Sequence, residues 1–278
     1  MKQLYKRLIV LRSLINKVTV FLHPDYIAAV MHTGLLKKHI SKKEIIPIEH
    51  TGSSVLNLEV IETLNQLLTK PDWKACDINI ILSGHFTKFR ISKWNDALSK
   101  DERKTLVRHQ MDEIYDNKLH VFFSGDRFGK NALAVAIELD FYNLLLDLEK
   151  KLKIRLLSIN PYFVVIANYW RSSIASTALM IVKENAFVYI ATTNVNSWEM
   201  IKTIPMNEGW ESDVDKLISR KMMQFEVKAA PMNIYFHDEK KSKFVPNVFS
   251  TNSNNVISLN TNGMPDANAK FLFASYLS

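Results

Sequence analysis

The order of predicted strands and helices repeats in the two halves of this chain, and that repeat constrains the fold more than any single motif. Apolar runs rich in β-branched residues predict strands, and apolar residues at helical spacing predict helices. In the first half the order is three strands, a helix and a strand, over residues 18–22, 26–32, 43–50, 54–70 and 76–83. The second half repeats this order, with two strands in 177–193, followed by 197–205, 211–226 and 232–238. The duplicated ββ(β)αβ unit predicts an α/β protein of two related lobes, although no residue-level repeat accompanies it.

Further elements are predicted between the two copies. A strand over 86–94 precedes a helix over 99–116, for which Ser99 is the expected N-cap. A hairpin over 119–138, a helix over 139–153, a strand over 154–160 and a helix that begins at Pro161 complete this part. We therefore predict a basic N-terminal helix at 1–16, a first lobe with an inserted subdomain at 17–172, and a second lobe at 173–278 that ends in a closing helix.

The charge balance is basic, and it leaves several classes of partner open. The chain has 278 residues, is 47% hydrophobic and carries a formal net charge of +8, which is an ordinary composition for a globular protein with a sizeable core. A basic surface favours nucleic acid, an anionic membrane face or an acidic protein. The lysines and arginines are dispersed rather than clustered, so a basic protein without any such partner is an equal alternative.

Cysteine content and the N-terminus limit the class further. Cys76 is the only cysteine, so neither an internal disulfide nor a cysteine-based zinc site can form, which suits a reducing compartment. Lys6, Arg7 and Arg12 interrupt the N-terminal apolar stretch, unlike the charge distribution of a signal peptide. The stretch is either an amphipathic helix that touches a membrane or partner, or a helix packed on its own domain. No apolar run reaches the roughly 18–20 residues of a membrane-spanning helix.

Short motifs that resemble catalytic signatures have the wrong spacing. Ser83-Gly84-His85 lacks the first glycine of a nucleophile elbow and precedes a predicted strand, so we expect a hairpin bend. The run 125–131 has its glycines one residue too close for a phosphate loop and ends in asparagine, so it also reads as a hairpin turn. The stretch 86–90 interleaves aromatic and basic residues without a clean aromatic face. None of the eight histidines forms a His-x-x-x-His pair, and we assign no catalytic and no metal-binding residue.

An ordered set of motifs resembles a known family. An apolar strand ends in Leu-Ser, a strand with an arginine ends in tryptophan, and an acidic helix ends near a tyrosine; these are Leu82-Ser83, Arg90, Trp94, Asp101, Glu102 and Tyr115. This order is similar to the cytoplasmic region of the L proteins of type II secretion systems, over about residues 17–171 and more weakly beyond. That family is related in fold to PilM of type IV pili, to FtsA and to actin. The resemblance implies a two-lobed actin-like (ribonuclease H-like) fold.

The resemblance also implies where a nucleotide would bind. Actin-like proteins hold phosphate between two hairpin turns that contain Asp and Gly. The corresponding turns here are His23-Pro24-Asp25 and Lys183-Glu184-Asn185, and neither has a glycine. Proline also lacks the N–H that could donate to phosphate. His23, Asp25, Lys183 and Glu184 are therefore the candidate positions of a degenerate phosphate site, and no cofactor is expected.

By resemblance, the expected function is that of a non-catalytic scaffold. L-type proteins recruit the secretion ATPase to the cytoplasmic face of the inner membrane and connect it to membrane partners. The expected partners are an assembly ATPase and the cytoplasmic tail of a bitopic inner-membrane protein, with a second copy of the chain as a further candidate. L-type proteins continue into a transmembrane helix, which this sequence does not show, so we expect a free-standing relative such as PilM or an excised domain. The alternatives are an actin-like ATP-binding protein or filament-forming ATPase and, third, a basic nucleic-acid-binding protein.

Overall fold

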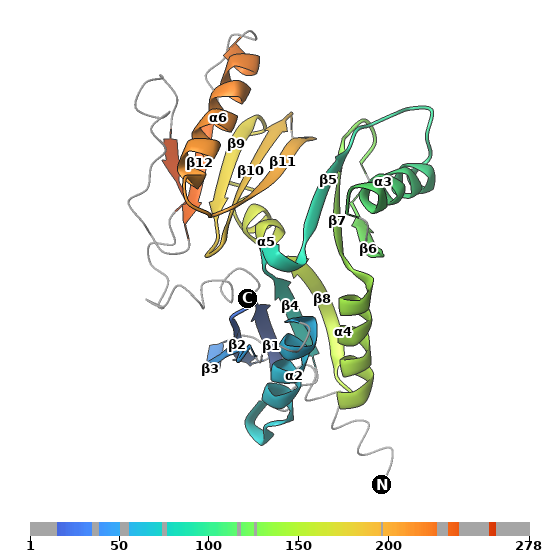
Figure 1. Ribbon diagram of the computed structural model, residues 1–278, viewed down its shortest axis with the longest axis vertical. Coiled ribbons are helices and arrows are strands. Elements are labelled where there is room, and N and C mark those ends of the chain that lie inside the picture. The colour runs from blue at the N-terminus through green and yellow to red at the C-terminus, as the bar shows by residue number, and fades with distance from the viewer. Residues whose placement is uncertain are drawn as a thin grey trace. The chain divides into compact units, whose positions relative to one another are not determined.

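The computed structural model describes residues 16–34, 39–50, 56–73, 77–115, 118–124, 127–195, 197–226, 233–238 and 256–259 (Figure 1). The predicted N-terminal helix, apart from its last position, and the predicted closing helix lie outside these residues, as does Cys76. The described chain forms two compact units. Unit 1 contains the described parts of the chain up to Thr87 together with Ile137–Ile166, and unit 2 contains Lys88–Ala136 and the described residues from Ala167 onward.

Sheet I, in unit 1, has five strands in the order β3-β2-β1-β4-β8. Its strands are β1 (Asn16–Leu22), β2 (Tyr26–Thr33), β3 (His39–Pro47), β4 (Asp77–Leu82) and β8 (Arg155–Pro161). The first three strands pair antiparallel, whereas β4 pairs parallel with both β1 and β8. The interior strands are buried along nearly their whole length, which explains their continuous apolar sequences.

Helices and short 3-10 turns connect the strands of unit 1. They are α2 (Leu56–Thr69), η1 (Pro71–Trp73), η2 (Gly84–Phe86) and α4 (Leu139–Leu152), and α5 (Tyr162–Tyr169) continues from unit 1 into unit 2. Helix α2 buries Val60, Leu64 and Leu67, which recur at helical spacing as predicted. Pro71 follows the last turn of α2 and begins η1, as expected of a residue that cannot extend a helix.

Sheet III, in unit 2, repeats the strand order of sheet I as β11-β10-β9-β12-β13. Its strands are β9 (Ala178–Lys183), β10 (Phe187–Asn194), β11 (Ser197–Pro205), β12 (Asn233–Asp238) and β13 (Val256–Ser258), and α6 (Trp210–Glu226) lies between β11 and β12 in sequence. The pairing directions also repeat, because β9 and β10 are antiparallel while β9, β12 and β13 are parallel. The predicted duplication is therefore confirmed at the level of topology.

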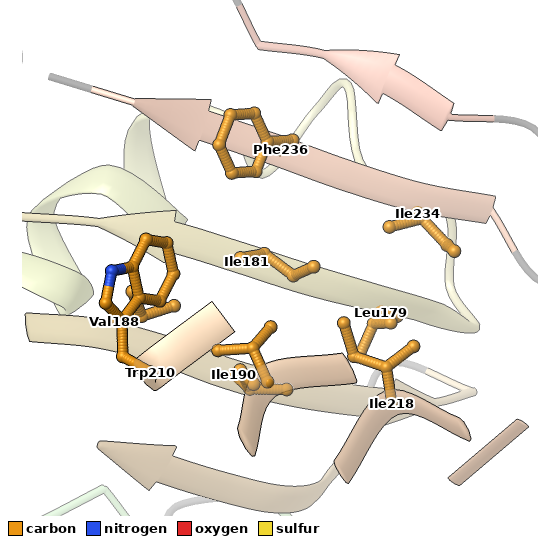
Figure 2. Packing of buried hydrophobic residues seen from close by; sticks show 9 residues of the cluster. Leu179, Ile181, Val188, Ile190, Trp210, Ile218, Ile234 and Phe236 are labelled. Atoms are coloured by element: carbon orange, nitrogen blue, oxygen red, sulfur yellow. The ribbon is translucent and has the colours of Figure 1, made fainter. Parts of the chain in front are cut away.

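The core of sheet III forms between alternate strand residues and one stripe of α6. Its buried members are Leu179, Ile181, Val188, Ile190, Trp210, Val214, Ile218, Ile234 and Phe236 (Figure 2). The strand members are two residues apart, so they share one face of the sheet, and the α6 members are four apart, so they share one face of the helix. The periodicity in the sequence thus explains both the elements and how they pack.

A smaller sheet II has the order β5-β7-β6 and is covered by α3. Its elements are β5 (Lys88–Ser92), α3 (Lys100–Tyr115), β6 (Leu119–Phe123) and β7 (Ala132–Glu138). The predicted cap is confirmed, because Ser99 Oγ accepts the Glu102 N–H at 3.2 Å and Glu102 Oε2 accepts the Ser99 N–H at 2.8 Å. This segment was predicted as a subdomain inserted in the first lobe; it groups with unit 2, where β5 lies against β11.

The structure corrects three local predictions. Strands β4 and β5 belong to different sheets, so Ser83-Gly84-His85 is not a hairpin bend. The chain continues in a 3-10 turn instead, in which Phe86 is buried and stacks on Phe141 with 4.8 Å between ring centroids. Strand β3 begins four residues before the predicted 43–50, because its exposed polar residues give little apolar signal. Pro161 ends β8 rather than beginning α5.

Candidate functional site

The first candidate turn, His23-Pro24-Asp25, joins β1 to β2 and is closed by backbone hydrogen bonds. The His23 N–H donates to Tyr26 O at 3.1 Å, and Asp25 O accepts the N–H of Ile48 at 2.9 Å. The His23 ring is 1% exposed and stacks on Tyr26 with 4.6 Å between ring centroids. Its Nδ1 accepts the Asp25 N–H at 3.2 Å. The histidine therefore points into unit 1 and supports its own turn.

A short charged network continues from this turn. His50 Nε2 lies 3.5 Å from Asp25 Oδ1, and its Nδ1 is hydrogen-bonded to Glu59 Oε2 of α2 at 2.8 Å. The hydrogen bond to Glu59 raises the pKa of His50 above its ordinary value, with a further contribution from Asp25 and against the effect of desolvation. The Asp25 side chain remains 66% exposed. His50 therefore links the turn to the start of α2 through two carboxylates.

The second candidate turn, Lys183-Glu184-Asn185, occupies the same topological position between β9 and β10. The Glu184 N–H donates to Phe187 O at 2.8 Å, and Ala186 O accepts the N–H of Met206 at 2.9 Å. These two bonds repeat the pattern of the first turn, which places Glu184 in the position of His23. The Glu184 carboxylate is 1% exposed and accepts a short hydrogen bond from the Tyr189 hydroxyl. Glu184 therefore also points into its own unit.

Lys183 is held beside this turn rather than projecting from it. Its side chain is 12% exposed, with Nζ 3.5 Å from Asp238 Oδ2 and 5.6 Å from the centre of the Trp210 ring. An ammonium placed between a carboxylate and an aromatic face gains from both. Among the four candidate positions, only the Asp25 carboxylate is largely exposed.

The candidate residues form two pairs, one in each unit. His23 and Asp25 share a turn in unit 1, and Lys183 and Glu184 share a turn in unit 2. Sequence reasoning missed His50, which lies beside Asp25, Glu59, which is hydrogen-bonded to His50, and Tyr189, which donates to Glu184. No local sequence pattern predicts the hydrogen bond between His50 and Glu59. Tyr189 lies two residues into the strand that follows the Glu184 turn, so its contact with that turn could have been predicted from the strand pattern.

The other motifs have structural roles. Ser83 is fully buried, and its Oγ accepts the backbone N–H of His85 at 3.3 Å, which caps the 3-10 turn. The run that resembled a phosphate loop joins β6 to β7, as predicted, and Gly129 adopts φ +68°, a left-handed conformation that glycine adopts without strain. Among the described residues, no group of three or more His, Cys, Asp or Glu side chains is arranged so that it could hold a metal ion. None of the described helices combines the length and apolar character needed to cross a membrane.

Comparison with known proteins defines the fold. No family model and no curated protein sequence matches the chain. A Bacteroides thetaiotaomicron protein with an actin-like ATPase fold and unknown function superposes with a TM-score of 0.60 at 9% identity, covering 96% of each chain. The PilM–PilN type IV pilus biogenesis complex gives 0.62 at 9% identity, covering 89% of each chain. The cytoplasmic domain of EpsL, an inner-membrane component of the type II secretion system of Vibrio cholerae, gives 0.58 at 8% identity, covering 94% of each.

These similarities show that the chain has an actin-like fold, which confirms the predicted fold class. The resemblance drawn from the sequence motifs to PilM and to the cytoplasmic region of L-type proteins is likewise confirmed at the level of the fold. The match spans nearly the whole of each chain, so it includes both copies of the duplicated unit.

Proposed function

We propose that this protein is a non-catalytic cytoplasmic scaffold of a type II secretion or type IV pilus-like assembly machine. One observation carries the proposal: both turns at which an actin-like ATPase would hold phosphate are built around an inward-facing polar side chain. His23 and Glu184 are each 1% exposed and support their own hairpins. A side chain committed to its own turn is not available to position a metal ion or a water molecule beside a phosphate.

The proposed location is the cytoplasmic face of the inner membrane, and the proposed partners are an assembly ATPase and the cytoplasmic tail of a bitopic membrane protein. The fold is shared with PilM, which is solved in complex with PilN, and with EpsL, an inner-membrane component. The basic net charge of +8 suits an acidic partner or an anionic membrane. The edge strands β3 and β8 of sheet I offer backbone groups that an extended tail could pair with.

A thermal-shift measurement with Mg-ATP tests the non-catalytic part of the proposal. A site of micromolar affinity at millimolar ATP would stabilise the protein by about 4 kcal/mol. We expect no shift, and no release of phosphate above the rate of the buffer. A thermal shift that is lost in Glu184→Gln and retained in Glu102→Gln would establish the alternative, an actin-like ATP-binding protein. Glu102 serves as the control because it is an exposed acid in the first turn of α3 and does not belong to either candidate turn.

Co-purification tests the scaffold part. The tagged chain should recover an assembly ATPase or a pilus-type membrane protein from native membranes of cells that express all components. The untagged chain serves as the control. Recovery of neither partner would contradict the proposal, whatever the outcome with ATP. Retention on DNA with a steep salt dependence would instead favour a nucleic-acid-binding function; the burial of Phe86 in the segment that interleaves aromatic and basic residues argues against it.

A further inference from the structure

A cavity of about 330 Å³ lies within unit 2, away from the candidate turn of that unit. It is bordered by the turn between β6 and β7, the end of α5 and the segment that follows it, and the ends of strands β9, β10 and β11. Ala178, the first residue of β9, lines the cavity, whereas Lys183 is the last residue of that strand. Five residues of strand separate the two positions by about 16 Å. The cavity is therefore distinct from the candidate phosphate turn.

The polar wall of the cavity is cationic. Arg127, Lys130 and Arg171 line it, together with the amide side chain of Asn168, and no carboxylate occurs among the described lining residues. The two arginines come from segments 44 residues apart in sequence, since 171 − 127 = 44, and both are exposed. Guanidinium groups present several N–H donors in a fixed plane, which matches phosphate and carboxylate oxygens.

Hydrogen bonds hold this wall in place. The Asn131 backbone N–H donates to Ser197 Oγ at 2.9 Å, and the side-chain Nδ2 of Asn131 donates to Trp198 O at 2.8 Å. Lys130 Nζ donates to Val195 O at 2.9 Å and keeps two further N–H groups. The turn between β6 and β7 is thus attached to the β10–β11 end of sheet III at three points. Lys130 and Asn131 are thus held in place before a ligand arrives, which lowers the conformational entropy that this part of the wall loses on binding.

The cavity also has apolar lining residues. Ala178 and Met180 of β9 are buried there, and Ile174 and Trp198 are partly exposed along the cavity. The volume lies within the range of about 300–1,000 Å³ that is typical of sites for small molecules. A cavity lined by both cationic and apolar side chains is suited to a ligand that combines an anionic group with an apolar body.

We propose that this cavity binds a small organic anion, in which one phosphate, sulfonate or carboxylate group is held by Arg127 and Arg171 and an apolar body lies against Met180 and Trp198. The site is additional to the proposed scaffold function and does not depend on it. Binding at the junction of sheets II and III would stabilise the attachment between them, because the ligand contacts both sides.

The fluorescent probe 8-anilinonaphthalene-1-sulfonate tests the proposal, because it combines one anionic group with an aromatic body. We expect one probe molecule to bind per chain, with displacement by inorganic phosphate at high concentration. Arg171→Gln and Arg127→Gln should each weaken binding about tenfold, the loss of one charge-assisted hydrogen bond. Arg108→Gln is the matched control, since Arg108 is an exposed arginine on α3 that does not line the cavity.

Two further measurements keep the test decisive. N-phenyl-1-naphthylamine, the uncharged analogue of the probe, should bind far more weakly if the arginines hold an anion. Ala175→Phe narrows the cavity without altering its charge and should also reduce probe binding. Equal loss in Arg108→Gln and Arg171→Gln, equal affinity for the uncharged analogue, or no saturable binding at millimolar probe would each overturn the proposal.

Discussion

His237 should make unit 2 less stable in mildly acidic solution. Its ring, on β12, is 2% exposed, and Nδ1 lies 3.3 Å from Leu259 O. Burial lowers the pKa of His237 from its ordinary 6.5 to about 4, although the Leu259 carbonyl and Asp238 both oppose the change. The unfolded chain therefore binds a proton between pH 6.5 and 4 that the folded chain does not. Stability is retained above pH 6.5 and decreases as the pH falls toward 4.

The size of this effect follows from the two pKa values. With 6.5 in the unfolded state and about 4 in the folded state, lowering the pH from 7.5 to 4.5 removes about 2.5 kcal/mol of folding free energy through this one group. His237→Asn removes the titration while leaving an amide that can reach the Leu259 carbonyl. The pH dependence of the variant should be smaller than that of the wild-type protein by this amount.

Urea unfolding followed by tryptophan fluorescence at pH 7.5, 5.5 and 4.5 measures the difference between the two proteins. About half of the effect should already be present at pH 5.5. Nuclear magnetic resonance titration of the His237 ring provides an independent check, with no protonation expected above pH 5. Identical pH dependence in the wild-type protein and in His237→Asn, or a ring that titrates near 6.5, would refute the reasoning.

Three other predictions concern single elements. The hydrogen bond to Glu59 raises the pKa of His50, so His50 stabilises the folded protein below pH 6.5, and this stabilisation is lost as the pH rises through the pKa of His50 in the folded protein. The melting temperature of His50→Gln should therefore vary less between pH 5.5 and 8.5 than that of the wild-type protein. Ser99→Ala removes the cap of α3 and should cost about 1 kcal/mol in chemical denaturation, with Ser99→Asp restoring most of it. Ile218→Ala empties part of the core in Figure 2 and should cost about 2–5 kcal/mol, against about 1 for Ile218→Val, by the same assay; equal costs would contradict the packing.

The local elements and their order could be predicted from the sequence. Strand and helix periods are set by the backbone, so alternate apolar residues such as Ile234 and Phe236, or residues four apart such as Val214 and Ile218, reveal which face is buried. Ser99 likewise predicted the start of α3, because an N-cap residue forms its hydrogen bonds within three residues along the chain. The duplicated order, and from it the two-unit fold, followed from these local patterns and from the ordered family motifs.

The contacts between distant segments became visible in the three-dimensional structure. It separated β4 and β5 into different sheets, because burial of Phe86 against Phe141 outweighs the local tendency to form a hairpin. It also joined His50 to Glu59, and it placed Arg127 and Arg171 around one cavity. Such pairings depend on sheet register and on the packing of residues tens of positions apart. No periodic pattern in the chain encodes them.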